Sequence, residues 1–229
     1  MKKVISFSLW GDKPKYMIGA IKNVELCKIY YPEFECWFYV HDESVPIDTI
    51  NKLKSYDNVK IISKNGDLEK IKPMMWRFEP IDDPDVSIMM SRDTDTRIWL
   101  REVLAVYEWL NSDKLFHIMR DHPYHGEKIL GGMFGTRKIP QINSWIDMMD
   151  KYVQNGNIGY DQVFLRQFIY PIVVNNSIIH DTFFKWELHS KNFPIPFNDN
   201  YNFVGEYVYE DESRNQVHIN MIKQRIGKL

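Results

Sequence analysis

The first half of the chain alternates strand-like and helix-like segments. In residues 4–9, Ile5, Phe7 and Leu9 occupy every second position, which predicts a strand with one apolar face. Apolar side chains then recur every three or four positions up to Tyr31, the spacing of a helix that buries one side. By the same criteria we expect further strands at 36–41, 59–62 and 87–90, and helices at 47–53 and 100–110.

This order of elements predicts an α/β fold with a mainly parallel, Rossmann-like sheet flanked by helices. The second half is less regular. It suggests strands at 116–119, 129–134 and 178–180, helices at 142–153 and 160–168, and beyond residue 193 a tail that wraps the domain. Since no linker or internal repeat divides the chain, we expect one domain over residues 1–229.

Composition narrows the class of protein. The chain has 229 residues, 44% of them hydrophobic, and a formal net charge of −2. It has no apolar stretch near the roughly 20 residues of a membrane span, and no dense Lys/Arg run for nucleic acid. Cys27 and Cys36 are its only cysteines, so no disulfide framework or zinc spacing is present. Because the start of the chain does not resemble a signal peptide, we expect a cytoplasmic protein.

The strongest chemical signal is Asp93-Thr94-Asp95, which follows the predicted strand at 87–90. Ligands of such sheets bind beyond the carboxyl ends of the strands. Two carboxylates there suit Mg²⁺ or Mn²⁺, which take one or two carboxylates and complete their ligand set with substrate phosphates. The alternative is structural, because Asp95 or Thr96 is also suited to cap the following helix.

Two other carboxylate motifs fit this segment less well. Phosphatases of the haloacid dehalogenase type share D-x-D-x-T, with the first Asp as nucleophile, but no downstream G-D-x-x-x-D completes that site here. An EF-hand is excluded because Arg97 stands at a ligand position and no Glu closes the loop.

The order of motifs along most of the chain resembles that of GT-A type glycosyltransferases. The motifs are Asp93-Thr94-Asp95, Leu130-Gly131-Gly132-Met133-Phe134-Gly135, Tyr160-Asp161-Gln162 and Ile179-His180-Asp181. Three longer strings resemble uncharacterised members from polysaccharide loci and large DNA viruses: residues 91–97, 119–123 and 203–206. The resemblance implies a single GT-A-like domain, with a nucleotide-sugar-binding half at 1–97 and an acceptor-side half with the C-terminal tail at 98–229.

The resemblance also implies a metal site. In GT-A enzymes the D-x-D carboxylates hold Mn²⁺ or Mg²⁺ against the donor diphosphate, which makes Asp95 a direct ligand and Asp93 a ligand or ribose contact. A histidine on a late strand often completes the set, and His180 has that place. The alternative for His180 is a strand-end histidine that is hydrogen-bonded within the core.

The donor contacts implied by the resemblance lie near the strand ends. Ser8, Trp10, Tyr16 and Asp42 are expected near the nucleoside, and Gly131 and Gly132 near the sugar. The alternative for the two aromatic residues is packing in the core or a loop, and the alternative for the glycines is a bend or bulge in a strand. Arg77, Arg92 or Arg120 would supply a cation to the phosphates. The alternative for Arg92 is an ion pair with the neighbouring aspartates.

The catalytic assignment stays open between several groups. Asp121 and Asp161 are candidates for a general base on the acceptor hydroxyl. In retaining GT-A families an Asp-Gln pair lies near the reacting sugar, which makes Asp161 and Gln162 candidates here. Asp161 is equally suited to cap the helix that follows it.

These observations together predict a metal-dependent hexosyl- or deoxyhexosyltransferase of polysaccharide biosynthesis. It would move a sugar from a nucleotide-sugar donor, with a UDP-sugar favoured, to a carbohydrate or glycoconjugate acceptor. Two alternatives remain. One is a phosphatase or phosphotransferase that forms an acyl-phosphate at Asp93, and the other is a carbohydrate-binding protein without turnover.

Overall fold

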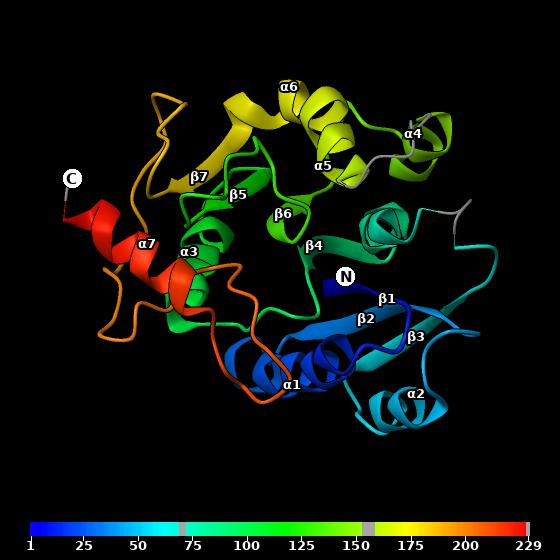
Figure 1. Ribbon diagram of the computed structural model, residues 1–229. Coiled ribbons are helices and arrows are strands. Elements are labelled where there is room, and N and C mark those ends of the chain that lie inside the picture. The colour runs from blue at the N-terminus through cyan, green and yellow to red at the C-terminus, as the bar shows by residue number, and fades with distance from the viewer. Residues whose placement is uncertain (69–71, 153–158, 228–229) are drawn as a thin grey trace.

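The computed structural model describes residues 1–68, 72–152 and 159–227, and in them one mixed sheet of seven strands. The order across the sheet is β3-β2-β1-β4-β6-β5-β7 (Figure 1). The strands are β1 (Lys2–Leu9), β2 (Phe34–His41), β3 (Val59–Lys64), β4 (Val86–Arg92), β5 (Phe116–Arg120), β6 (Met133–Arg137) and β7 (Ser177–Asp181).

Helices surround this sheet. They are α1 (Pro14–Tyr30), α2 (Ile47–Lys54), the 3₁₀ helix η1 (Pro73–Asp82), α3 (Leu100–Leu110), α4 (Trp145–Lys151), α5 (Tyr160–Phe164), the π turn η2 (Leu165–Ile169), α6 (Tyr170–Val173), the 3₁₀ turn η3 (Val174–Asn176) and α7 (Gln216–Ile226). No helix in the described ranges has the length and apolarity to cross a bilayer.

Six of the seven described strands point the same way. Strands β3, β2, β1 and β4 pair in parallel, β6 runs antiparallel to both β4 and β5, and β7 is parallel to β5. The α/β fold with a mainly parallel sheet is therefore confirmed. As a consequence, the carboxyl ends of the six strands and the amino end of β6 lie along one edge, which we call the carboxyl edge.

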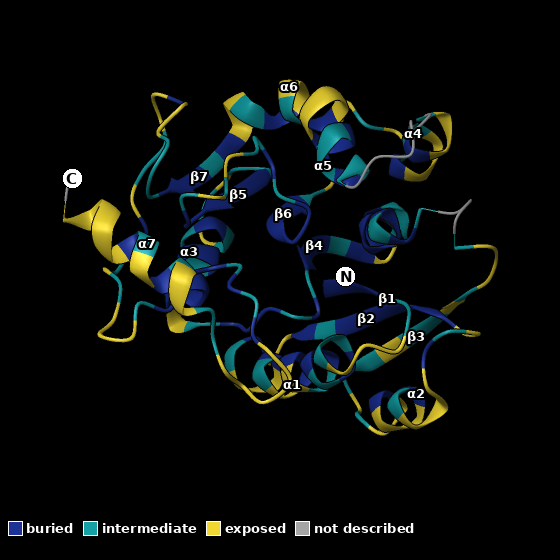
Figure 2. Cartoon of the chain, in the orientation of Figure 1, coloured by how far each residue is buried: buried dark blue, intermediate teal, exposed yellow. Residues whose placement is uncertain are grey.

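The core has two parts because alternate side chains of a strand point to opposite faces of the sheet. On one face, residues of β1 such as Ile5 and Phe7 pack with α1, α2 and α3. On the other, Val4 packs with η1, α4 and the segment from α5 to α6. Figure 2 shows most of the strands buried, the edge strand β3 partly exposed, and the outer sides of the helices exposed.

Several predicted boundaries were wrong. The strand expected at 129–134 is β6, which begins at Met133 because the paired glycines before it belong to a turn at the carboxyl edge. The helix expected at 142–153 begins at Trp145, where Ser144 caps it by accepting from the Asp147 N–H. Residue 153 lies outside the described residues. The helix expected at 160–168 continues instead through a π turn into α6.

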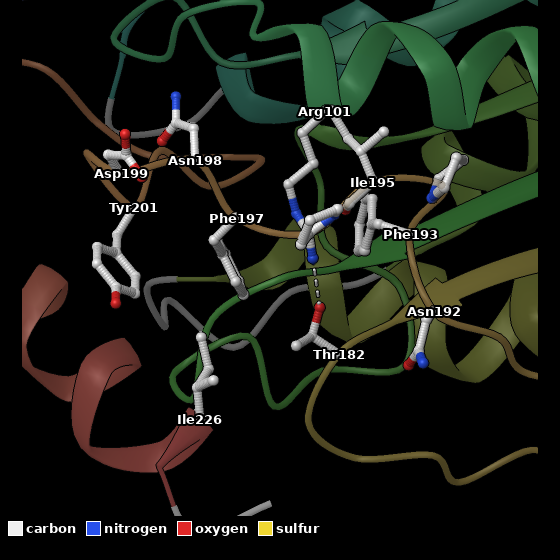
Figure 3. A pocket seen from close by; sticks show the side chains of 12 residues that line it. Arg101, Thr182, Asn192, Phe193, Ile195, Phe197, Asn198, Asp199, Tyr201 and Ile226 are labelled. Carbon is white, nitrogen blue, oxygen red and sulfur yellow. Dashed lines mark hydrogen bonds between the residues drawn. The ribbon is translucent and has the colours of Figure 1, made fainter.

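The C-terminal tail wraps the carboxyl edge, as expected. The Val208 N–H donates to the Asp95 carbonyl (2.8 Å), and the Val204 N–H donates to the Asp121 carboxylate (3.0 Å). The tail ends in α7, a helix that the sequence analysis missed, which is capped by the Asn215 side chain. Between the tail, α3, α7 and the end of β7 lies a pocket of about 670 Å³, which we call the tail pocket (Figure 3).

Candidate active site

A second pocket, of about 640 Å³, opens at the carboxyl ends of β1 and β4 beside the start of α1; we call it the edge pocket. It is lined by Ser8, Leu9, Trp10, Gly11, Asp12, Lys13, Tyr16, Met74, Arg77, Asp93, Thr94 and Asp95. Six of the residues predicted from sequence are among them: Ser8, Trp10, Tyr16, Arg77, Asp93 and Asp95.

The D-x-D segment forms the turn that leaves buried β4. The Thr96 hydroxyl donates to the Asp93 carbonyl (2.9 Å), and the amide of Asn23 on α1 donates to the carbonyls of Thr94 (3.1 Å) and Thr96 (2.9 Å). The turn thus exposes 42% of the Asp93 side chain and 16% of the Asp95 side chain. Neither Asp95 nor Thr96 caps the next helix, because Trp99 occupies that position, so the structural alternative is wrong.

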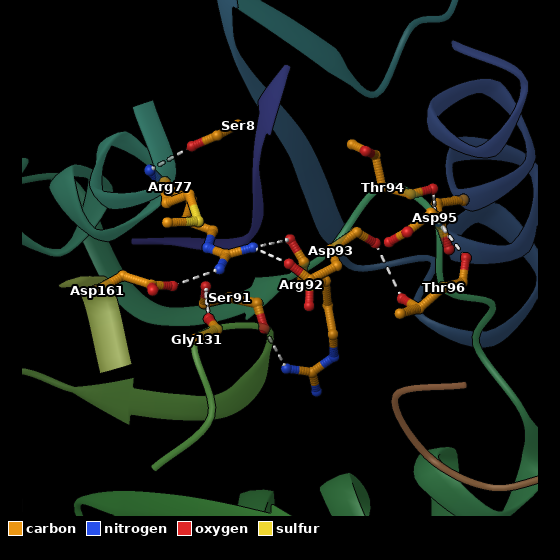
Figure 4. A network of polar contacts seen from close by, with 12 residues as sticks. Ser8, Arg77, Ser91, Arg92, Asp93, Thr94, Asp95, Thr96, Gly131 and Asp161 are labelled. Atoms are coloured by element: carbon orange, nitrogen blue, oxygen red, sulfur yellow. Dashed lines mark hydrogen bonds and ion pairs between the residues drawn. The ribbon is translucent and has the colours of Figure 1, made fainter. Parts of the chain in front are cut away.

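Arg77 lies at the centre of the charged cluster (Figure 4). Its guanidinium pairs with Asp93 and, at 2.9 Å, with Asp161, while its backbone N–H donates to the Ser8 hydroxyl (3.1 Å). Burial alone would lower the pKa of this guanidinium, but the charges of Asp93 and Asp161 outweigh it and raise the pKa. Arg77 therefore stays charged and joins η1, the D-x-D turn and α5.

Gly131 and Gly132 approach this cluster at positions where no side chain fits. A Cβ atom on Gly131 would lie 2.1 Å from an oxygen of Asp161, and one on Gly132 would lie 2.0 Å from an oxygen of Asp93. The Ser91 hydroxyl holds the turn by donating to the Gly131 carbonyl (2.6 Å). The structure thus brings both glycines to the predicted site, although their contact with a sugar stays a prediction.

The carboxylates of the cluster repel one another. Burial raises the pKa of Asp95, and the nearby Asp93 charge raises it further, against an ion pair with Lys15 at 3.0 Å. Burial also raises the pKa of Asp161, opposed by Arg77 and assisted by Asp93. Within the described part of the chain, Asp161 Oδ1 and Arg77 Nε are buried without a hydrogen-bond partner. They are two of ten such atoms in the described residues, and these two lie in one charged cluster, where a ligand or a water molecule can satisfy them.

Asp93 and Asp95 fit a divalent cation that takes its other ligands from a substrate. Across the described ranges, no group of three or more His, Cys, Asp or Glu side chains is placed to hold a metal ion. Asp93 is 42% exposed, and the repulsion that raises the pKa of Asp95 would be reduced by a divalent cation held by these carboxylates. Mg²⁺ and Mn²⁺ suit such a site, because one or two carboxylates together with phosphate oxygens satisfy them.

The structure does not bring His180 to these aspartates. It lies on β7, three strand positions from β4, which is about 14 Å across the sheet. Its ring nitrogens contact His117 (2.9 Å) and Glu108 (3.0 Å), and burial lowers its pKa to about 4. The prediction of a third metal ligand is therefore wrong here, and the alternative of a hydrogen-bonded core histidine holds.

Asp121 is not placed to act as a base. It is fully buried after β5, where its carboxylate accepts two hydrogen bonds from Arg101 (both 2.8 Å) and others from Thr182 and the Val204 N–H. Because these donors occupy the carboxylate and it does not line the edge pocket, its predicted catalytic role is contradicted.

Two predicted phosphate contacts are buried ion pairs instead. Arg92 pairs with Glu102 on α3 (2.7 Å) and donates to the Phe134 carbonyl (2.9 Å). Arg120 pairs with Asp181 (2.8 Å) and with Glu187. Both side chains hold strands to their neighbours and point away from the edge pocket, whereas Arg77 lines it.

The remaining predicted residues lie beside the site. Asp42 is exposed after β2 and does not line the edge pocket. Gln162 follows Asp161 on α5, is half-buried and does not line it either. Asp161 is not the cap of α5, because Gly159 occupies that position with a φ of 84°.

Sequence reasoning missed Lys15. It lies in the first turn of α1, pairs with Asp95, and places its ammonium 4.5 Å from the Tyr16 ring centroid and 5.4 Å from that of Tyr207. The sequence did contain a signal for this residue: Lys13 and Lys15 flank Pro14 at the start of the helix that follows β1, next to the edge where ligands were expected. Asn23 and Tyr207 were also missed, because their roles depend on contacts across the fold.

Comparisons with known proteins agree with this architecture. No protein-family model matches the chain, and neither does any curated protein. Among solved structures, one similar chain is a glycosyltransferase involved in the glycosylation of the major capsid of PBCV-1, with 14% identity and a TM-score of 0.50 over 79% of this chain and 82% of that one. Another is the galactosyltransferase LgtC, solved in complex with donor and acceptor sugar analogues, with 12% identity and a TM-score of 0.50 over 99% of this chain and 96% of that one. The chain therefore has the GT-A type fold of these glycosyltransferases.

Proposed function

We propose that the protein is a metal-dependent glycosyltransferase that moves a hexosyl or deoxyhexosyl group from a nucleotide diphosphate, UDP favoured, to a hydroxyl of a carbohydrate acceptor. The observation that carries this proposal is the charged cluster at the edge pocket. There Arg77 pairs with both Asp93 and Asp161, and the Asp93 carboxylate repels that of Asp95. The GT-A type fold supports it.

The donor would lie along the floor of the edge pocket. Trp10 and Tyr16 offer ring faces for a nucleoside base. Lys13 and Tyr16, at the start of α1, line the pocket, and the amino end of a helix favours a diphosphate. Lys15 and Arg77 add fixed positive charge beside it.

Asp93 and Asp95 would hold Mn²⁺ or Mg²⁺ together with the donor phosphates. When bound, the ion neutralises the charge that develops on the departing diphosphate as the glycosidic C–O bond breaks. Lys15 and Arg77 pair with the two carboxylates in the absence of an ion, so these cations keep the turn in place until the donor arrives.

Asp161 would accept a hydrogen bond from a hydroxyl of the donor sugar or of the acceptor. Its Oδ2 is held by Arg77 at 2.9 Å, while its buried Oδ1 has no partner among the described residues. An oxygen of this kind is strongly favoured to accept a hydrogen bond from a ligand, since leaving it unpaired costs about 1–3 kcal/mol. Asp161 is itself 1% exposed and, like Asp121, does not line the edge pocket. Unlike Asp121, it has a carboxylate oxygen without a partner among the described residues, and it pairs with Arg77, which does line the pocket. Asp161 is therefore our candidate for the group that accepts the proton of the acceptor hydroxyl.

Thermal unfolding with nucleotide sugars tests the proposal. The panel contains UDP-, GDP- and dTDP-sugars, each with and without Mn²⁺. A donor at a hundred times its Kd adds about 2.7 kcal/mol, which raises the midpoint of a chain of this size by about 5–10 °C. We expect the shift to require Mn²⁺ and to disappear in Asp95→Ala.

The matched control is Asp113→Ala, which removes an exposed aspartate away from both pockets. It should keep the full shift. A wild-type protein that gives no shift with any nucleotide, but hydrolyses p-nitrophenyl phosphate, would instead favour the phosphatase alternative.

A further inference from the structure

We propose that the tail pocket binds a neutral sugar unit of an oligosaccharide acceptor, away from the site of transfer. The occupant's role as an acceptor rests on the proposed function, whereas the binding of a carbohydrate does not. The pocket has about 670 Å³ and shares no lining residue with the edge pocket. Figure 3 shows the aromatic side chains and Arg101 around it.

Aromatic rings form one wall of the tail pocket. The Arg101 guanidinium lies 4.4 Å from the ring centroid of Phe193 and 4.0 Å from that of Phe197, which fixes both rings. Phe197 in turn lies nearly parallel to Tyr201, with centroids 6.4 Å apart and planes at 26°. Phe197 and Tyr201 are only half-buried, so apolar ring area remains for the C–H face of a pyranose.

Tyr201 is held in a costly backbone conformation. Its φ is 54°, in the left-handed region that bulky residues avoid. The Tyr201 N–H donates to the Asn198 carbonyl (2.8 Å), and Arg214 donates to the Tyr201 carbonyl (3.1 Å) while pairing with Glu206 (2.7 Å). Strain that surrounding contacts maintain in this way is typical of a functional site, and here it sets the ring on the pocket wall.

The polar groups of the tail pocket suit hydroxyls better than phosphates. Exposed polar side chains at its rim are Asn192, Asn198 and Asp199. The amides can donate hydrogen bonds to sugar hydroxyls and accept them, and the carboxylate can accept them. The positive charge of Arg101 is already matched by the bidentate carboxylate of Asp121. Two further charges beside the pocket are of opposite sign: the Asp199 carboxylate and the Lys223 ammonium, which lies 5.1 Å from the Tyr201 ring centroid. A pocket with apolar walls and polar groups of both signs at its rim fits a neutral carbohydrate.

The two pockets are connected through the tail. The carboxylate that holds Arg101 also accepts from the Val204 N–H (3.0 Å), and the next residue, Gly205, lies so close to Met133 that a Cβ would be 2.3 Å from its sulfur. Met133 follows Gly132, which contacts Asp93. The tail pocket lies at the end of β7, three strand positions or about 14 Å from β4, a separation that an oligosaccharide along the carboxyl edge can span.

Saturation-transfer NMR without any nucleotide tests the binding of carbohydrate. The panel contains neutral glucan, galactan and mannan fragments of one to six units at millimolar concentration. We expect saturation of at least one oligosaccharide by the wild-type protein, its loss in Phe197→Ala and Tyr201→Ala, and its retention in Tyr201→Phe, which keeps the ring. Phe168→Ala is the matched control, because Phe168 is 42% exposed and lines neither pocket.

Two results would overturn the proposal: no binding of any panel member by the wild-type protein, or binding that persists in both alanine variants. Kinetics then test the acceptor role. Phe197→Ala should raise the KM for a bound oligosaccharide about tenfold and leave the KM values for donor and monosaccharide unchanged, whereas an unchanged oligosaccharide KM contradicts it. If nucleotide sugars fail to bind while Phe197-dependent glycan binding stands, the proposed function fails and the carbohydrate site remains.

Discussion

At the scale of single residues, Gly132 leaves no room for a side chain beside Asp93. A methyl group added at Gly132 would lie 2.0 Å from the Asp93 carboxylate oxygen and 2.9 Å from its backbone nitrogen, so the D-x-D turn must move. We expect Gly132→Ala to lower the free energy of unfolding by about 1–3 kcal/mol and to abolish the Mn²⁺-dependent nucleotide shift. Thermal unfolding with and without ligand measures both.

The control for this substitution is Gly126→Ala. A Cβ there would meet only the Phe184 ring, at 3.7 Å, which is ordinary van der Waals contact. It should leave both the midpoint and the nucleotide shift near their wild-type values. A Gly132→Ala protein with the full Mn²⁺-dependent shift would show that the position of Asp93 does not matter for the donor.

At the scale of elements, the sequence predicted the strands better than the contacts made at their ends. The run up to Met90 and the carboxylates after it identified β4 and its turn, because a buried strand and a polar loop have opposite compositions. The hydrophobic pattern could not reveal η1. This segment contains two prolines and is a 3₁₀ helix, so its apolar residues do not recur with the 3.6-residue period of an α-helix. Arg77, which lies on it, was nevertheless named as a candidate. His180 was misjudged because a strand residue's partners depend on which strands flank it, and β7 lies at the edge of the sheet.

The histidine pair between β5 and β7 should make the protein less stable in acid. Burial lowers the pKa of His180 to about 4 and that of His117 well below its usual value. Between these values and about pH 6.5, the unfolded chain binds protons at these histidines and the folded state does not, so acid favours unfolding. This stabilisation is complete above about pH 6.5 and is lost as the pH falls towards 4. At one pKa unit per 1.4 kcal/mol, His180 accounts for about 2 kcal/mol between pH 7 and 5.

Urea unfolding at pH 7, 6 and 5 measures this slope. His180→Gln keeps a polar side chain that can contact Glu108 but does not titrate, so its free energy of unfolding should fall less with pH than that of the wild type. His189→Gln removes an exposed histidine and should leave the slope unchanged. Equal slopes in all three proteins would mean that the pKa of His180 is the same in the folded and unfolded states.

At the scale of the whole molecule, the halves inferred at 1–97 and 98–229 share one sheet and both faces of its core. Strand β4 pairs with β1 on one side and with β6, from the other half, on its second side. The cluster around α1 also contains Trp109, and the cluster around η1 contains Trp37 together with Trp145. Neither half can bury its apolar surface alone, so we predict that residues 1–229 unfold as one cooperative unit.

Urea unfolding followed by two probes tests this prediction. Tryptophan fluorescence reports on both clusters, since Trp37, Trp109 and Trp145 are all buried, and far-UV circular dichroism reports on the helices of both halves. Coincident curves are the signature of a single transition. A fragment of residues 1–97 should lack a cooperative transition, because it leaves β4 without its β6 partner and α1 without the packing of α3. Separate transitions, or a fragment that unfolds cooperatively, would instead mean that residues 1–97 form a domain in their own right and that the strands from β5 onwards pack against it as a second unit.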